Sequence, residues 1–278
     1  MTNFDIDTYK SLFEIIEPTK EFQVYEGSLD SIFNDIIDIL KKKVKSKKDY
    51  SILAFHSPRI IRGLVDCKQD NPEDPKLLEL LRQGIFVSFR IYRQYDDPVT
   101  SDEVVRLRDS IARVDETILK RKVSQYEDTI NLVASSPQFS QASANRLYEL
   151  IECKDAIMFA TGHGGINTGL DVALRYEELS GKRIIFYPIR YSRTGYKGYK
   201  DQKPCLTKPE IEYLREKVKS KKIIVFDENS NTGTGIGTVT KIVEKEIAQN
   251  QKVEKIYNID SSKPGDWVAL FNELLQNS

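Results

Sequence analysis

The sequence predicts an α/β protein in two parts: an α+β domain over residues 1–140 and a parallel-sheet domain over residues 141–278. Short apolar runs alternate with helical patterns through the second part, as is typical of βαβ units. Glycine-rich loops follow two of these runs. A chain of 278 residues is long enough for one large or two modest domains.

The first part mixes helical and strand-like patterns. Apolar residues at helical spacing predict helices over 28–48, 74–84 and 101–134, and the apolar runs 49–55 and 85–92 predict strands. The Ser-rich segment 135–143, which contains a proline, interrupts the pattern. We therefore place the domain boundary there.

The second part is more regular. Strands are predicted over 155–161, 182–191, 223–228 and 252–260. Helices are predicted over 143–154, from the end of the loop 162–169 to about 180, over 208–219, from the end of the Gly/Thr loop 232–235 to about 248, and over 266–276. In a parallel sheet of this kind, ligands bind beyond the carboxyl ends of the strands. Both glycine-rich loops fall at such ends.

The composition excludes several classes of protein. Lys plus Arg equals Asp plus Glu, 42 each, so there is no overall field for nucleic acid or an anionic membrane. The three cysteines form no CxxC, and two histidines leave little for a His-rich metal site. With no apolar run long enough to span a bilayer and no signal-peptide pattern, we expect a cytoplasmic protein without a membrane partner.

The stretch 222–237, KIIVFDENSNTGTGIG, carries the clearest chemical signal. A buried strand ends in Asp227 and Glu228, and a loop of Asn, Ser, Thr and Gly leads into a helix. Glycines let backbone N–H groups converge on an anion, and the helix N-terminus favours negative charge. The loop is no Walker A motif because it lacks GxxxxGK[ST], and Thr238 stands at the last position of a dinucleotide-binding GxGxxG.

The order of strand, acid pair, Thr/Gly loop and helix resembles the phosphoribosyl-pyrophosphate (PRPP) signature of the type I phosphoribosyltransferases. The resemblance implies that the catalytic residues Asp227 and Glu228 face the ribose hydroxyls. It also implies that the 5′-phosphate is bound by Asn231, Thr232, Gly233, Thr234 and Gly235. Negative charge close to the anomeric carbon would favour the cationic transition state.

The segment 155–169, DAIMFATGHGGINTG, is similar to the family's first core strand and diphosphate loop. By resemblance, the diphosphate would be bound by Ala160, Thr161, Gly162, His163 and Gly164. A tight strand-to-helix turn would also require glycine, and His163 is either a diphosphate contact or an exposed loop residue.

The polar loop after the strand 182–191 corresponds to the family's mobile loop, which closes over the site with basic residues. Arg190 and Arg193, nearest the strand end, are the residues expected to act in catalysis, and the later lysines are expected to be solvated. The resemblance covers about 150–262 and leaves 1–140 without a family.

The resemblance implies a phosphoribosyltransferase-like fold and the transfer of a phosphoribosyl group between PRPP, or a nucleotide, and a nitrogenous base. Mg²⁺ is the implied cofactor. It would be held mainly through the ligand, with Asp227 and Glu228 as candidate ligands. The acceptor base is not readable from the sequence, and a homodimer would fit the family.

Two other functions stay open. Asn229 and Ser230 stand where the family usually has apolar residues, which fits a non-catalytic PRPP or nucleotide-binding regulator, or an effector of a bacterial conflict or defence system. A nicotinamide-dependent oxidoreductase is disfavoured by the incomplete GxGxxG. Trp267 is either a platform for the base or part of a helical apolar core stripe, the latter favoured. His56 is expected to be a satisfied loop histidine rather than part of an anion site.

Overall fold

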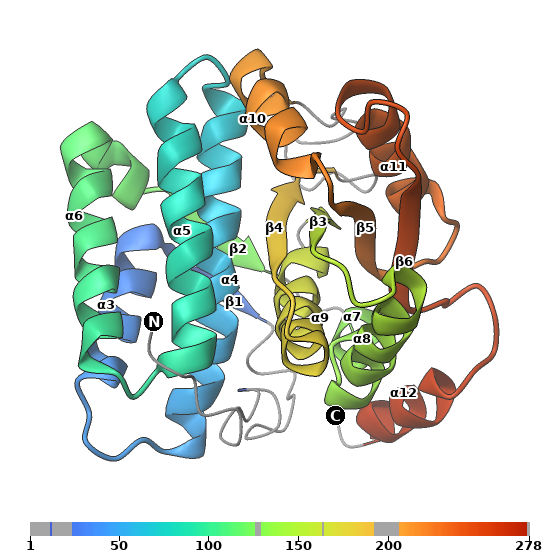
Figure 1. Cartoon of the computed structure of the whole chain (residues 1–278). Coiled ribbons are helices and arrows are strands. Elements are labelled where there is room, and N and C mark those ends of the chain that lie inside the picture. Colours follow the sequence, from blue (N-terminus) through green and yellow to red (C-terminus); the bar gives the residue numbers. More distant parts are fainter. Residues whose placement is uncertain (1–11, 13–23, 126–128, 163, 192–205, 277–278) are drawn as a thin grey trace.

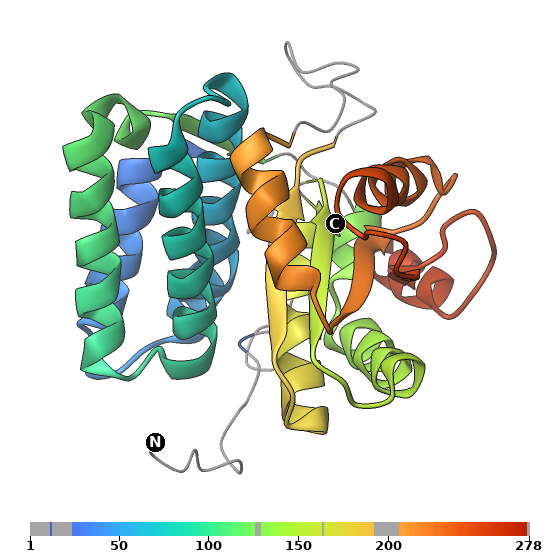
Figure 2. The ribbon, with the colours of Figure 1, turned by 45° about the horizontal axis from the view of Figure 1, so that its top comes forward.

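A computed structural model describes residue 12 and residues 24–125, 129–162, 164–191 and 206–276 of the chain. A helical bundle lies beside a parallel sheet that carries helices of its own (Figure 1). Figure 2 shows the same two parts from another side, with the bundle next to the β4 edge of the sheet. Buried apolar side chains of both parts form one continuous cluster.

The first part is mainly helical within the described residues. Its elements are β1 (Tyr25–Ser28), α3 (Leu29–Leu40), α4 (Lys47–Asp70), α5 (Pro75–Gln94), α6 (Pro98–Leu119) and β2 (Lys122–Gln125). The strands β1 and β2 pair antiparallel. Two predicted helices differ from those in the structure. The helix predicted over 28–48 ends at Leu40, and the segment 101–134 contains most of α6, β2 and the short α7 (Thr129–Ala134) instead of one helix.

The predicted strands 49–55 and 85–92 are wrong, since both runs are helical. Ser46 and Asp49 form a capping box that starts α4 directly before the first run. Gly84 was expected to end the helix 74–84 just before the second run, but a Cβ at this glycine would lie 2.6 Å from Leu64 of α4. The glycine permits close approach of α4 and α5, and α5 continues through it.

Pro58 lies inside α4, where it removes the backbone hydrogen bond to the carbonyl of Ala54. The hydroxyl of Tyr92 on α5 donates to that carbonyl over 2.6 Å. Tyr92 is fully buried, so its own hydroxyl needs a partner as well. A contact between two helices thus compensates for the proline and lets α4 stay continuous.

The second part is an α/β unit with a parallel sheet, as expected. Its elements are α8 (Pro137–Ile151), β3 (Ala156–Thr161), α9 (Gly164–Ser180), β4 (Ile184–Ile189), α10 (Lys208–Val218), β5 (Lys222–Asn229), α11 (Thr234–Glu246), β6 (Val253–Ile259) and α12 (Trp267–Gln276). The strand order is β4-β3-β5-β6, with all neighbours parallel. The Ser-rich segment 135–143 is mostly the first half of α8, with Pro137 in its first turn.

The strand order creates a switch point between β3 and β5. From β3 the chain crosses through α9 to β4 on one side, and from β5 it crosses through α11 to β6 on the other. Such crossovers are right-handed, so two connections that lead toward opposite edges of the sheet place their helices on opposite faces. A crevice is expected between these helices, at the carboxyl ends of the two central strands. A ligand site is expected there.

Candidate functional site

The acid pair lies at this switch point. Asp227 and Glu228 occupy β5 just before its end at Asn229. Glu228 is 8% exposed and Asp227 is half-buried. Two carboxylates so close together and so poorly hydrated repel each other, and one of them is expected to retain a proton.

Asp227 is a carboxyl whose pKa is raised in this way. Burial, together with the charge and hydrogen bonding of Glu228, raises the pKa of Asp227 well above its ordinary value. The backbone N–H of Glu228 donates to Asp227 Oδ1 over 3.1 Å and opposes the shift without cancelling it. Asp227 is therefore able to donate a hydrogen bond when protonated and to accept from a ligand hydroxyl when ionised.

The Thr/Gly loop leads into the first turn of α11, as predicted. Gly233 is the N-cap residue, with a φ of 67° that favours glycine, and its position leaves the helix start without a side-chain cap. The side chains of Asn231, Thr232 and Thr234 are exposed. The first N–H groups of α11 are thus available to an anion, in the place where the 5′-phosphate was predicted.

Gly235 brings the loop against the acid pair and the end of β3. A Cβ at this position would lie 3.3 Å from Asp227 Oδ2 and 3.9 Å from both Thr161 Cγ2 and Tyr191 Cδ1. The absence of a side chain here keeps open the space between β3 and β5. Two of the segments singled out in the sequence therefore meet at one glycine.

Thr161, the last residue of β3, places its methyl group toward Gly235 and carries a buried hydroxyl on the same side chain. Its side chain is buried, and its Oγ1 has no hydrogen-bond partner among the residues that the structure describes. A buried hydroxyl without a partner costs about 1–3 kcal/mol, so such groups usually face a ligand or water. The position beside Gly235 suits a ligand oxygen.

The second glycine loop follows Thr161 directly. Gly162 has a φ of 59°, and its N–H donates to Ile189 O over 2.9 Å. A Cβ on Gly162 would approach the carbonyl oxygen of Tyr191 to 2.6 Å, so the loop packs tightly on the end of β4. Ala160 is buried within β3, and His163 lies outside the described residues.

The start of α9 is already close to a carboxylate. Any side chain at Gly164 would overlap the carboxylate of Glu228, and a Cβ at Gly165 would lie 3.6 Å from Glu228 Oε2. A carboxylate is favourable at a helix N-terminus because of the helix dipole. Glu228 therefore lies where the resemblance predicts the diphosphate.

Arg190 follows β4 and forms an ion pair with Asp66 of α4, with 3.0 Å between Arg190 Nη1 and Asp66 Oδ1. Arg62 lies one helical turn before Asp66. The pKa of Arg62 is lowered to about 10, mainly by burial and also by the charge of Arg190, while the charges of Asp66 and Glu228 oppose the shift. Arg193, the other predicted catalytic arginine, lies outside the described residues.

Sequence reasoning missed Arg62 and Asp66 as members of the site. Both residues follow His56, which was expected to lie in a loop after the predicted strand 49–55. His56 lies instead on α4, buried, with Nε2 3.0 Å from Asp35 Oδ2 and Nδ1 2.8 Å from Arg59 Nη1. Both ring nitrogens are engaged within the fold, so His56 is satisfied, though not in a loop.

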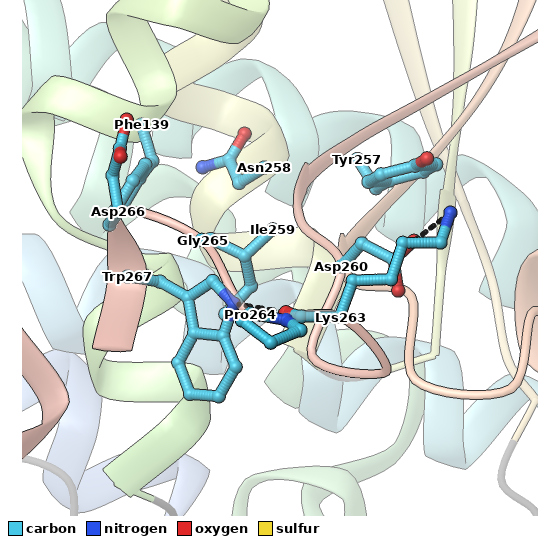
Figure 3. A pocket seen from close by; sticks show the side chains of 10 residues that line it. All are labelled: Phe139, Tyr257, Asn258, Ile259, Asp260, Lys263, Pro264, Gly265, Asp266 and Trp267. Carbon is cyan, nitrogen blue, oxygen red and sulfur yellow. Dashed lines mark hydrogen bonds and ion pairs between the residues drawn. The ribbon is translucent and has the colours of Figure 1, made fainter.

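A cavity of about 430 Å³ adjoins the site at the end of β6 (Figure 3). Its lining residues are Phe139, Tyr257, Asn258, Ile259, Asp260, Lys263, Pro264, Gly265, Asp266 and Trp267. It is linked to the loop after the acid pair, because Ser230 N donates to Ile259 O over 2.9 Å and Ser261 N donates to Asn229 Oδ1 over 3.3 Å.

Trp267 does not join the core, contrary to the favoured expectation. Its indole is half-buried, donates from Nε1 to Lys263 O over 3.0 Å, and meets the ring of Phe271 edge to face at 5.9 Å. Leu270 and Phe271 are also only half-buried. The described part of this apolar stripe is therefore only partly buried, and Trp267 forms part of the cavity wall.

The described residues contain no group of three or more His, Cys, Asp or Glu side chains arranged to hold a metal ion. They also contain no helix that is both long and apolar enough to cross a membrane. Comparison of the chain with protein-family models, curated proteins and solved structures gives no match.

Proposed function

We propose that the protein binds the phosphoribosyl group of PRPP or of a nucleotide at the switch point and transfers it to or from a nitrogenous base. The observation that carries the proposal is the position of Gly235, where an added Cβ would lie 3.3 Å from Asp227 Oδ2 and 3.9 Å from Thr161 Cγ2. It brings the acid pair, the Thr/Gly loop and the end of the first sheet strand to one place. The phosphoribosyltransferase-like arrangement of the sheet domain is part of this proposal.

Each part of the ligand has a matching group. The first N–H groups of α11 would bind the 5′-phosphate, and Asp227 with Glu228 would accept hydrogen bonds from the ribose hydroxyls. Their negative charge would stabilise the positive charge that builds on the sugar during transfer. Thr161 Oγ1 would gain a partner in the ligand.

Mg²⁺ fits the site only as an ion held mainly by the ligand. Carboxylate oxygens suit it, but the described residues offer the acid pair and no third carboxylate in a metal-binding group. When bound, Mg²⁺ would neutralise charge on the leaving diphosphate. The residues of the chain hold the sugar, exclude water from the crevice and orient the phosphate.

The acceptor would bind in the cavity at the end of β6. Trp267, Tyr257 and Phe139 provide aromatic surface around it, and Asn258, Asp260 and Asp266 provide polar groups (Figure 3). A planar heteroaromatic base matches this combination of stacking surface and hydrogen-bonding edges.

A second function, that of a non-catalytic PRPP or nucleotide-binding regulator, is favoured by Glu228. Its carboxylate lies on the first turn of α9, and a diphosphate bound there would have to displace it. A protein that binds the phosphoribosyl group but holds the diphosphate poorly would sense the ligand without turning it over.

Isothermal calorimetry with PRPP and Mg²⁺ tests the shared part of both functions. Diphosphate release, measured with a panel of purine, pyrimidine and pyridine bases, separates them. Binding with turnover supports the transferase, and binding without turnover on any base supports the regulator. The absence of binding to PRPP and to nucleotides would refute both.

A further inference from the structure

Helix α4 of the bundle makes two charged contacts with the sheet part. Asp66 pairs with Arg190 at the end of β4, and the two side chains are only 17% and 10% exposed. Two residues further on, Lys68 Nζ lies 2.5 Å from Glu210 Oε1 on α10, where Glu210 is fully buried. Buried charges are retained when they are paired, so each contact depends on both partners.

The Lys68 contact fixes α4 firmly against the sheet. Glu210 also accepts a hydrogen bond from the hydroxyl of Tyr187 in β4, and its other oxygen accepts from Thr207 N over 2.8 Å in the capping box of α10. One carboxylate thereby joins α4, β4 and the start of α10. This carboxylate fixes the position of α4 relative to β4, close to the ion pair between Asp66 and Arg190.

The Asp66 contact lies at the candidate site. Arg190 comes between Ile189, whose carbonyl accepts from the N–H of Gly162, and Tyr191, whose carbonyl packs on Gly162. The end of β4 is therefore held against the glycine loop that follows β3. Arg62, on the same helix as Asp66, is within electrostatic reach of both Arg190 and Glu228.

Asp66 and Arg190 form an ion pair, and Arg62 interacts electrostatically with Asp66, Arg190 and Glu228. Removal of the Asp66 charge would take away an anion that offsets the repulsion between Arg62 and Arg190 in a poorly hydrated place. The long side chain of Arg190 would then lose this ion pair and gain rotamer freedom.

We propose that Asp66 is a positioning residue that holds the guanidinium of Arg190 at the carboxyl end of β4, beside the glycine loop that follows β3. The helical bundle, which has no counterpart in the resemblance, thereby completes the site in the sheet part. The part of this inference that concerns the ligand rests on the proposed PRPP-binding function. The part that concerns Arg190 in the free protein does not.

The experiment compares Asp66→Asn with Asp70→Asn. Asp70 lies one turn further along α4 and also pairs with an arginine, Arg121, but within the bundle. Calorimetry with PRPP and Mg²⁺ should show about tenfold weaker binding for Asp66→Asn, as for loss of one charge-assisted hydrogen bond, and unchanged binding for Asp70→Asn. Asp66→Glu, which keeps the charge, should recover most of the affinity.

A second readout uses no ligand. In ¹⁵N-labelled protein, the side-chain Nε–H signal of Arg190, identified by its loss in Arg190→Lys, should be distinct and slow to exchange in the wild type and in Asp70→Asn. In Asp66→Asn it should move to the position of exposed arginines and exchange at least about tenfold faster, because the buried ion pair is gone.

Unchanged PRPP affinity together with an unchanged Arg190 signal in Asp66→Asn would overturn the inference. Equal losses of affinity in Asp66→Asn and Asp70→Asn would overturn it as well, because they would indicate a general effect on folding. If the wild type binds no PRPP, the proposed function fails. The Arg190 signal then decides alone whether Asp66 positions this side chain.

Discussion

Alanine substitutions at Gly235 and Gly237 form a matched pair in the first two turns of α11. The N–H of Gly237 already donates to Gly233 O over 2.9 Å, and a Cβ there would meet nothing within 4 Å. Gly235 precedes it in the first turn, where backbone N–H groups lack helical partners. A Cβ at Gly235 would lie 3.3 Å from Asp227 Oδ2 and 3.9 Å from Thr161 Cγ2.

The two variants should differ little in stability and greatly in binding. Alanine in place of a helical glycine stabilises by roughly 0.5–1 kcal/mol, and we expect this gain at Gly237. At Gly235 the tight contact with Asp227 offsets part of the gain. The new methyl group also occupies the space where the ligand approaches α11, and loss of a charge-assisted hydrogen bond of about 1.5–3 kcal/mol weakens binding roughly 10- to 100-fold.

Calorimetry with PRPP and Mg²⁺ measures the affinity of both variants, and thermal unfolding in the absence of ligand confirms that each is folded. Gly237→Ala should bind like the wild type, and Gly235→Ala should bind at least about tenfold more weakly. Equal affinities for the two variants would refute the idea that the ligand approaches the backbone at Gly235. The proposed 5′-phosphate site would then have to be abandoned.

Three further predictions concern single side chains. Thr161→Val removes a buried hydroxyl that lacks a partner among the described residues, so urea unfolding should show about 1 kcal/mol of added stability while PRPP binding weakens; a loss of stability would contradict this. Asp227→Asn removes a carboxyl whose pKa is raised on folding. Such a group destabilises the folded wild type increasingly as pH rises from the unfolded pKa toward the folded one, so the variant should gain more stability at pH 7 than at pH 4; a gain independent of pH would count against it. Tyr92→Phe leaves Ala54 O without its 2.6 Å donor beside Pro58, and chemical denaturation should show a loss of about 1–2 kcal/mol. Tyr95→Phe, at the half-buried end of α5, is the control and should cost less.

Much of the sheet part was predictable because its signals are local. Four apolar runs separated by helical patterns predicted parallel strands, and each run overlaps one of the strands β3 to β6. The loop at Gly233 and Gly235 was predictable because a left-handed N-cap and a close approach both require glycine. These requirements can be read within a few neighbouring residues.

The errors in the first part have one physical cause. The runs 49–55 and 85–92 are apolar enough for strands, but they are helical because α4 and α5 pack on each other. Pro58 and Gly84 indicate helix ends when considered alone. Tyr92 of α5 compensates for Pro58 of α4, and the close approach of Leu64 of α4 requires a glycine at position 84 of α5. In each case the cause lies on the other helix.

By itself, the sequence determined the alternation of strands and helices in the second part and the order of acid pair and glycine loop on β5. Only the tertiary structure decided that Glu228 lies on the first turn of α9 and that Asp66 of the bundle reaches Arg190. Hydrophobic periodicity and helix capping act between neighbours in the chain, and so they leave a pattern in the sequence. The pairing of buried charges acts across space, and its partners are chosen by whichever elements the packed core brings together.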